Sequence, residues 1–213
     1  MSKKRVKVES FLYADYETLG PENSENLYLL LHGFGESGHK MLKRLKAYLP
    51  PDSLLLAPNG IYPLPQKTEE GYNLGYAWYF YDSIKKIYYI DYELPASFLE
   101  GLIKTLGWDN KKLTIIGYSQ GGYLAPFAGL KMPQCEHVIT VNANYKYDMF
   151  CPPISFRFDG LNGMKDEMVD PYMAKESYKK LQESGVSGCF YDFPDEGHRF
   201  SKAFLEKIKQ LTQ

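Results

Sequence analysis

Short apolar runs alternate with amphipathic segments along most of this chain. The apolar runs predict strands at 27–31, 53–57, 112–116, 137–141, 154–158 and 188–193. Apolar side chains at helical spacing predict helices at 40–49, 95–106, from the glycine-rich turn near 120 to 131, and at 171–183 and 201–211. This order predicts one α/β domain over residues 1–213, with a mostly parallel central sheet and helices on both faces.

One long segment, 61–92, interrupts the alternation. It is polar and aromatic, shows no clear period and holds seven of the 19 tyrosines between residues 72 and 92. A loop of this length inside a compact domain is usually functional, so we expect a lid or a pocket wall. Parallel sheets bind ligands at the carboxyl ends of their strands, and functional residues are therefore expected in the loops that follow strands.

Charge and cysteine content narrow the class of protein. The 25 Lys and Arg nearly balance the 26 Asp and Glu, which argues against nucleic acid as the main partner. The N-terminal segment lacks the apolar core of a signal peptide, and no apolar run reaches the roughly 18 residues of a membrane span. Cys135, Cys151 and Cys189 have no metal-binding spacing and are expected to be reduced. Together these features predict a cytoplasmic protein without a bound metal.

The segment Gly117-Tyr118-Ser119-Gln120-Gly121 fits the pattern G-x-S-x-G between a predicted strand and a predicted helix. In that context the pattern indicates a nucleophile elbow, in which glycines permit close backbone approach and the serine is held in a strained conformation. The helix that starts beside Ser119 directs unpaired N–H groups toward the same place, which favours an oxyanion. The alternative is that Ser119 merely caps this helix.

A serine hydroxyl needs a base, normally a histidine that a carboxylate orients. Elbow folds of this type have the order serine, acid, histidine, which excludes His32 and His39. His137 follows Ser119 by 18 residues and leaves little room for an acid loop. His198, directly after the strand at 188–193, is therefore the predicted base, the alternative being an exposed loop histidine.

Asp159 and Asp166 both follow the predicted strand at 154–158. We favour Asp166 as the acid that orients His198, and Asp159 stays an alternative. Asp170 with Pro171 reads as the start of a helix and has a structural role already.

The glycine-rich segment 32–38 follows the strand at 27–31, where this fold supplies an oxyanion donor. We predict that the backbone amides of Phe34 and Gln120 form the oxyanion hole, and that His32 braces the loop by hydrogen bonds. An aromatic wall around Trp78 is predicted to bind substrate, unless these rings only pack the segment onto the sheet.

Taken together, these landmarks resemble the phospholipase/carboxylesterase family of α/β-hydrolases, which includes acyl-protein thioesterases and small bacterial carboxylesterases. The matching segments are 32–38, Trp78, 117–122, 166–169 and Gly197-His198. The resemblance implies an α/β-hydrolase fold and a cofactor-free serine hydrolase acting on small-molecule esters or thioesters.

The chain departs from the family pattern around the acid, because Val169 precedes Asp170 rather than proline, and Asn162-Gly163 stands where a His-Gly pair is usual. Two other functions stay open. One is a non-catalytic binding protein on a hydrolase scaffold. The other is a lactone hydrolase of the dienelactone type, a group expected to carry cysteine at the position of Ser119.

Overall fold

A seven-stranded sheet forms the centre of the protein in the computed structural model, which describes residues 12–149 and 154–213. The strand order is β1-β3-β2-β8-β9-β10-β11, and only β1, at one edge, runs antiparallel to its neighbour. The strands are β1 (Tyr16–Leu19), β2 (Asn26–Leu31), β3 (Leu54–Pro58), β8 (Lys112–Tyr118), β9 (Cys135–Val141), β10 (Arg157–Gly163) and β11 (Phe190–Phe193).

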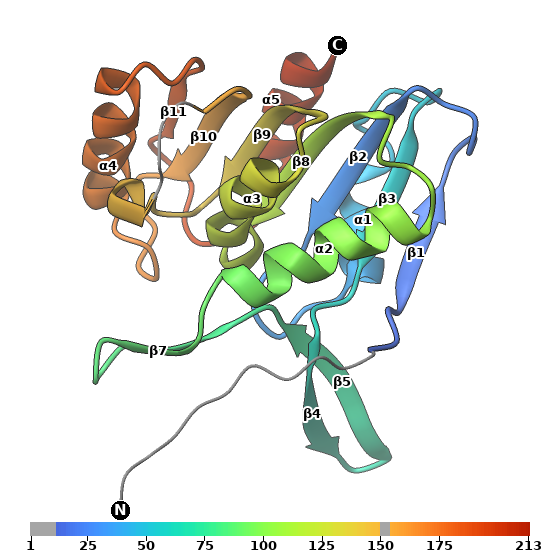
Figure 1. Cartoon of the computed structure of the whole chain (residues 1–213). Coiled ribbons are helices and arrows are strands. Elements are labelled where there is room, and N and C mark those ends of the chain that lie inside the picture. The colour runs from blue at the N-terminus through green and yellow to red at the C-terminus, as the bar shows by residue number, and fades with distance from the viewer. Residues whose placement is uncertain (1–11, 150–153) are drawn as a thin grey trace, which may run out of the picture.

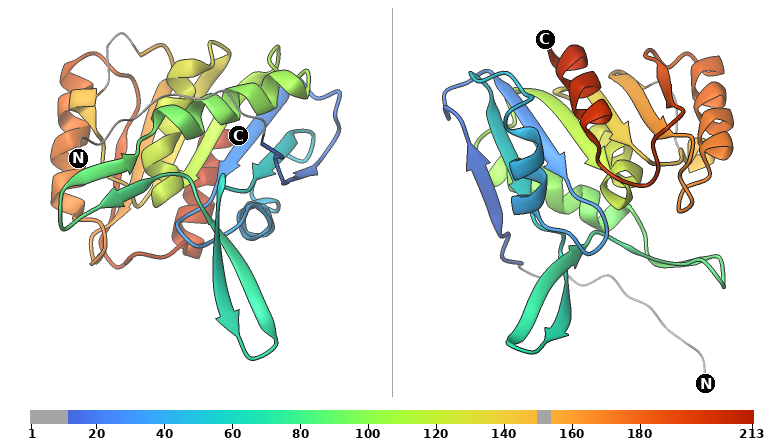
Figure 2. Two further views of the ribbon diagram at one scale, coloured as in Figure 1. Left: turned by 60° about the horizontal axis from the view of Figure 1, so that its bottom comes forward. Right: turned by 180° about the vertical axis from the view of Figure 1, so that it is seen from behind.

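Helices cover both faces of this sheet (Figures 1 and 2). Alternate side chains of β2 explain why both faces need cover, since Leu27, Leu29 and Leu31 join one core cluster while Tyr28 and Leu30 join the other. The helices are α1 (Gly38–Leu45) and α5 (Lys202–Thr212) on one face, and α2 (Glu93–Thr105), α3 (Gln120–Lys131) and α4 (Pro171–Glu183) on the other. The predicted α/β-hydrolase architecture is confirmed.

The predicted element bounds hold closely, with two exceptions. Helix α1 ends at Leu45, four residues before the predicted end at 49, and β10 spans Arg157–Gly163 rather than 154–158. Strand β10 contains Asp159, Gly160 and Asn162, all buried, so its apolar pattern stops before the strand does. Asp159 consequently lies inside the strand and not in the loop after it.

The segment 61–92 forms two β-hairpins instead of a loop. Strands β4 (Tyr62–Thr68) and β5 (Gly71–Ala77) make the first hairpin, which projects from the body of the protein (Figures 1 and 2). Strands β6 (Phe80–Asp82) and β7 (Ile87–Ile90) make the second. Most side chains of the first hairpin are exposed, so the alternation of apolar and polar positions that marks a strand is absent there.

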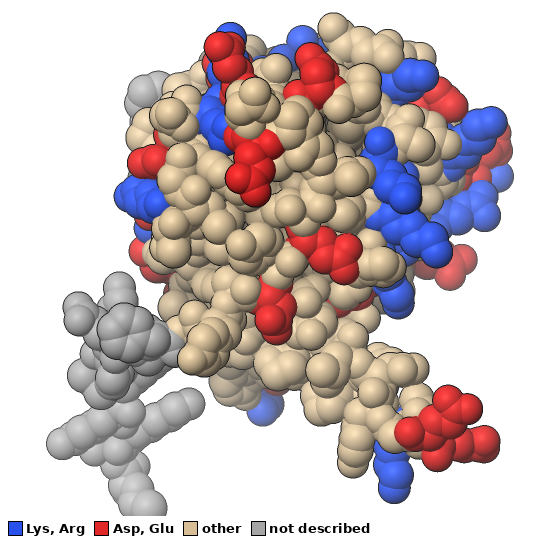
Figure 3. Space-filling model, turned by 90° about the vertical axis from the view of Figure 1, so that its right-hand side faces the viewer, with Lys and Arg blue, Asp and Glu red and all other residues tan. Residues whose placement is uncertain are grey.

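The distribution of charged side chains on the surface agrees with the near-neutral net charge of the chain. Figure 3 shows acidic and basic side chains intermixed over one face of the molecule. Cys135 and Cys189 are free thiols, while Cys151 lies outside the described residues. In residues 12–149 and 154–213 we find no helix long and apolar enough to cross a membrane, and no cluster of three or more metal-ligating side chains.

His32 braces the loop after β2, as predicted. The ring is fully buried, its Nε2 accepts the Gly60 amide at 2.9 Å, and its Nδ1 lies 2.7 Å from the Gly33 carbonyl. Because Nε2 accepts, the proton is on Nδ1 and the ring is neutral. Burial lowers the pKa of His32 to about 4. A neutral imidazole is thus built into the loop that follows β2, beside the point between β2 and β8 where the strand order reverses.

This lowered pKa predicts a pH dependence of stability. Between pH 6.5 and about 4 the unfolded chain binds a proton at His32 that the folded protein does not bind. The stabilisation is therefore complete above pH 6.5 and is lost as the pH falls toward 4, by about 3 kcal/mol. Urea unfolding of the wild type and of His32→Gln at pH 7 and pH 4 measures this loss.

In His32→Gln the side-chain oxygen can still accept from Gly60 but does not titrate. The variant is expected to be less stable at pH 7 and to lose about 3 kcal/mol less than the wild type on acidification. Equal losses in the two proteins would contradict a neutral, buried His32.

Candidate active site

Ser119 occupies a sharp turn between β8 and α3. Its backbone has φ 49° and ψ −115°, a strained conformation for a residue with a side chain. The Ser119 amide donates to the Val141 carbonyl at 2.9 Å, which ties the turn to the end of β9. The hydroxyl makes no capping hydrogen bond to α3, so the alternative that Ser119 serves as a helix cap is wrong.

Two glycines make this turn possible. A Cβ at Gly117 would lie 2.3 Å from the Gly121 carbonyl oxygen, and a Cβ at Gly121 would lie 2.4 Å from the carbonyl oxygen of Leu31. Both distances are too short for a real Cβ, and the clashing atoms belong to the backbone, which cannot shift as a flexible side chain can. The close approach of β2, β8 and α3 therefore requires glycine at both positions, as the motif predicts.

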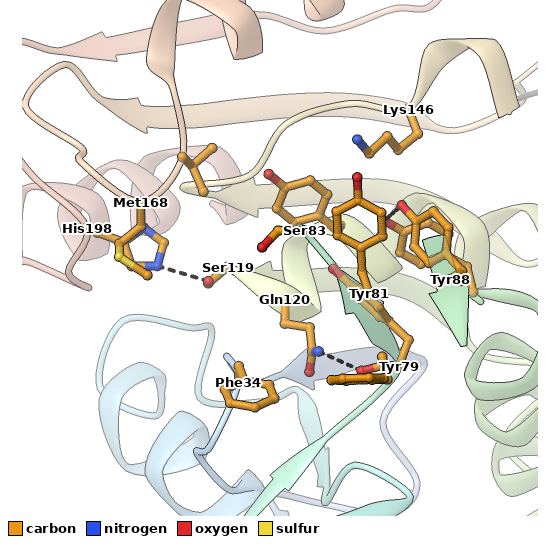
Figure 4. A pocket seen from close by; sticks show the side chains of 14 residues that line it. Phe34, Tyr79, Tyr81, Ser83, Tyr88, Ser119, Gln120, Lys146, Met168 and His198 are labelled. Carbon is orange, nitrogen blue, oxygen red and sulfur yellow. Dashed lines mark hydrogen bonds between the residues drawn. The ribbon is translucent and has the colours of Figure 1, made fainter. Parts of the chain in front are cut away.

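The predicted base and acid meet Ser119 in a chain of hydrogen bonds (Figure 4). His198 Nε2 lies 2.9 Å from Ser119 Oγ, and His198 Nδ1 lies 2.8 Å from Asp166 Oδ2. The other oxygen of Asp166 accepts the backbone amides of Met168 and Val169, each at 2.8 Å. The carboxylate fixes the proton on Nδ1, which leaves Nε2 to accept the serine proton.

Asp159, the alternative acid, belongs to a separate buried cluster. Its carboxylate accepts from His137 Nε2 and Arg157 Nε, both at 2.7 Å, and from the Cys189 amide at 2.8 Å. Burial alone would raise the pKa of this carboxyl, but the hydrogen bonds from His137 and Arg157 hold it below its ordinary value. Asp159 therefore stabilises the fold at β9, β10 and β11, and Asp166 is the aspartate at His198.

Asn142 organises the site, although no sequence motif marks it. It is fully buried with φ 51°, its Nδ2 donates to the carbonyls of Gly197 (3.0 Å) and Arg199 (3.3 Å), and its Oδ1 accepts the Gly163 amide at 3.0 Å. One side chain thus joins both flanks of His198 to the end of β10. The only available signal was an asparagine directly after a strand, a residue type that tolerates positive φ.

The predicted oxyanion donors border the same pocket as Ser119. In the described part of the chain, the backbone amides of Phe34 and Gln120 have no hydrogen-bond acceptor. Glu36 stabilises the loop that carries Phe34. Its carboxylate accepts the Gly33 amide at 3.3 Å and forms an ion pair with Arg44 through both oxygens, at 2.6 and 2.8 Å. These amides remain available for a negatively charged oxygen.

The prediction that Trp78 binds substrate in an aromatic wall is wrong, because Trp78 does not line the pocket. Its side chain is fully buried, and the indole N–H donates to the His32 carbonyl at 2.9 Å. Its backbone amide donates to Gln120 Oε1, while Gln120 Nε2 donates to the Tyr79 carbonyl. Trp78 is directed into the core because its polar atom finds a partner there, and it holds the second hairpin against the turn at Ser119.

Neighbours of Trp78 form the wall instead. A pocket of about 410 Å³ opens over Ser119, within the range typical of small-molecule sites. Tyrosines from the second hairpin and its flanks line one side of it: Tyr79, Tyr81, Tyr88 and Tyr92. The expectation that the segment 61–92 supplies a pocket wall therefore applies to its second hairpin.

Comparisons with known proteins agree with the fold. The model of the phospholipase/carboxylesterase family matches residues 19–213. A search of curated proteins finds no match. Among solved structures, the chain is similar to esterase PE8, with a TM-score of 0.74 and 19% identity over 94% of this chain and 98% of the other.

Acyl-protein thioesterase 2 of Zea mays has a TM-score of 0.74 and 16% identity over 93% of this chain and 97% of its own. A carboxylesterase of Mesorhizobium loti has a TM-score of 0.68 and 19% identity over 92% of each chain. At these identities the structural likeness shows the α/β-hydrolase fold alone, whereas the family model covers most of the sequence. The chain belongs to the phospholipase/carboxylesterase family.

Proposed function

We propose that this protein is a serine hydrolase that cleaves carboxylic esters or thioesters through an acyl-enzyme intermediate. The observation that carries the proposal is the hydrogen-bonded series Ser119, His198 and Asp166 at a strained turn in an open pocket. Membership of the phospholipase/carboxylesterase family supports an ester bond as the target.

In the first half-reaction, Ser119 Oγ attacks the carbonyl carbon while His198 Nε2 takes the hydroxyl proton. Asp166 stabilises the imidazolium that forms. The negative oxygen of the tetrahedral intermediate accepts from the amides of Phe34 and Gln120, two residues that line the pocket beside Ser119. When the intermediate collapses, His198 gives its proton to the departing alcohol or thiol, and the acyl group stays on Ser119.

The second half-reaction repeats these steps with water. His198 removes a proton from a water molecule, whose oxygen attacks the acyl-enzyme, and the carboxylic acid leaves as Ser119 regains its proton. The residues present supply every proton transfer. Ser119 also argues against a lactone hydrolase of the dienelactone type, in which cysteine is expected at this position.

The proposal extends to the domain organisation, the cellular compartment and the size of the substrate. We propose that residues 1–213 act as one domain, in the cytoplasm, on a small-molecule ester. Three cysteines, too few for a disulfide framework, support a reducing compartment, and the pocket volume supports a small substrate.

Removal of the nucleophile gives the primary test. Ser119→Ala is expected to lower kcat/KM for p-nitrophenyl butyrate by about 10⁴-fold or more, because no group replaces the attacking oxygen. Steady-state absorbance assays measure the rate, and thermal unfolding verifies that the variant folds. A wild type inactive on esters and thioesters of every acyl length would instead favour the non-catalytic binding protein.

A matched pair of substitutions tests the identity of the acid. Asp166→Asn is expected to lower kcat by about 10³- to 10⁴-fold, since an amide no longer fixes the tautomer of His198 or stabilises its charge. Asp159→Asn is expected to lower the melting temperature and to change kcat less than about threefold, because its partners His137, Arg157 and the Cys189 amide all lie away from Ser119 and His198. The reverse pattern would assign the acid to Asp159.

Asn142 is expected to act as a positioning residue. Asn142→Gly keeps a residue that adopts positive φ without strain but removes all three side-chain hydrogen bonds. We expect kcat to fall about tenfold or more with little change in KM, because His198 loses its fixed position relative to Ser119. Asn142→Asp keeps the acceptor for Gly163 but places a carboxylate oxygen against the carbonyls of Gly197 and Arg199, so it should lose at least as much. Equal kcat in the wild type and Asn142→Gly would exclude the role.

A further inference from the structure

One positively charged side chain lines the pocket over Ser119, while the carboxylates of Asp148 and Asp166 lie outside the lining and act electrostatically on Tyr88 and Tyr123. Lys146 is the only lysine or arginine among the described residues that line it, and no aspartate or glutamate lines it. No carboxylate in residues 12–149 or 154–213 forms an ion pair with the Lys146 ammonium. The ester chemistry described above does not use this charge.

The surroundings of Lys146 suit an anion. Its Nζ lies 5.8 Å from the centre of the Tyr123 ring. Lys146 and Tyr81 both line the pocket, and Figure 4 shows them on the same side of Ser119. Burial raises the pKa of Tyr123 to about 12 and also raises the pKa of Tyr88, so these phenols stay neutral at physiological pH. A cation beside neutral phenols attracts carboxylate or phosphate oxygens.

The position of Lys146 relative to His198 indicates which part of the substrate carries the anion. In Figure 4, His198 and Met168 lie on one side of Ser119, while Tyr81, Tyr88 and Lys146 lie on the other. His198 must protonate the departing oxygen or sulfur, so the leaving group occupies its side. The acyl part of the substrate then extends along the tyrosine wall toward Lys146.

We propose that the preferred substrate is an ester or thioester whose acyl chain ends in an anionic group, a carboxylate or a phosphate-like group, which Lys146 binds. This inference rests on the proposed serine hydrolase activity and specifies its substrate class. Lys146 acts as a specificity residue, because it contacts the far end of the acyl chain and takes no part in bond breaking.

A series of matched substrates tests the proposal. Mono-p-nitrophenyl esters of succinate, glutarate and adipate are compared with the neutral butyrate, valerate and hexanoate esters, after subtraction of the uncatalysed rates. At the best-fitting length, the wild type is expected to prefer the anionic ester in kcat/KM by roughly fivefold or more, the advantage of an ion pair in a partly open pocket. An acyl chain ending in phosphonate distinguishes a phosphate-like group from a carboxylate.

Three variants assign the preference to Lys146. Lys146→Met is expected to abolish the preference for the anionic ester, and Lys146→Arg to retain it. Lys104→Met is the matched control, because Lys104 is exposed on α2, pairs with Glu100 and lies outside the pocket, yet the change in net charge is the same. The wild-type preference is also expected to shrink as salt rises from about 0.05 to 0.5 M.

Two outcomes would overturn the proposal: equal or better cleavage of the neutral ester at every length, or an unchanged preference in Lys146→Met. Failure of the proposed function is distinguishable, since the protein would then cleave neither series. In that case calorimetry of Ser119→Ala with monomethyl adipate and with methyl hexanoate decides the anion site. Tighter binding of monomethyl adipate that Lys146→Met removes supports the site, and equal binding of the two rejects it.

Discussion

The hydrogen bond between Ser119 and His198 is the contact on which the proposed chemistry depends. Its two residues are 79 positions apart in the sequence and come from loops at the ends of different strands. The 2.9 Å contact forms because Ser119 is held in a strained conformation that only the glycines at 117 and 121 permit. The backbone of the turn fixes the Ser119 hydroxyl, and the hydrogen bonds of Asn142 to Gly197 and Arg199 fix the loop of His198. Because both groups are already aligned, little conformational entropy is lost when the reaction begins.

Two histidine–aspartate pairs, one within the sheet and one in the loops at its edge, show how surroundings decide function. The pair His137 and Asp159 is closed, since Arg157 and the Cys189 amide use the remaining carboxylate positions and the carboxylate is fully buried. The pair His198 and Asp166 has the same short contact, but its second ring nitrogen faces Ser119 in an open pocket. The first pair stabilises the strands, and only the second has a group to act on.

Much of this arrangement follows from the sequence, because local motifs carry it. The turn at Ser119, the loop at His32 and the start of α4 at Asp170 are each specified by glycines or capping residues within a few positions. Positions set by tertiary contacts were missed. The sequence predicts Trp78 in the pocket wall, whereas its indole N–H donates to the His32 carbonyl in the core. Asn142 carries no motif, because its partners Gly163 and Gly197 lie about 20 and 55 residues away in the sequence. The apolar pattern places β10 too early, because the later part of the strand includes the buried polar side chains of Asp159 and Asn162, which hydrogen bonds satisfy.

The central claim is that Ser119 is a nucleophile activated by His198, and covalent labelling measures this most directly. Intact-protein mass spectrometry after incubation with a fluorophosphonate, followed by peptide mapping, is expected to show one phosphonyl group on Ser119. Labelling should be slower by at least about 10³-fold in His198→Ala, which removes the base. Absence of a label on Ser119, or an equal rate of labelling in His198→Ala, would contradict the account.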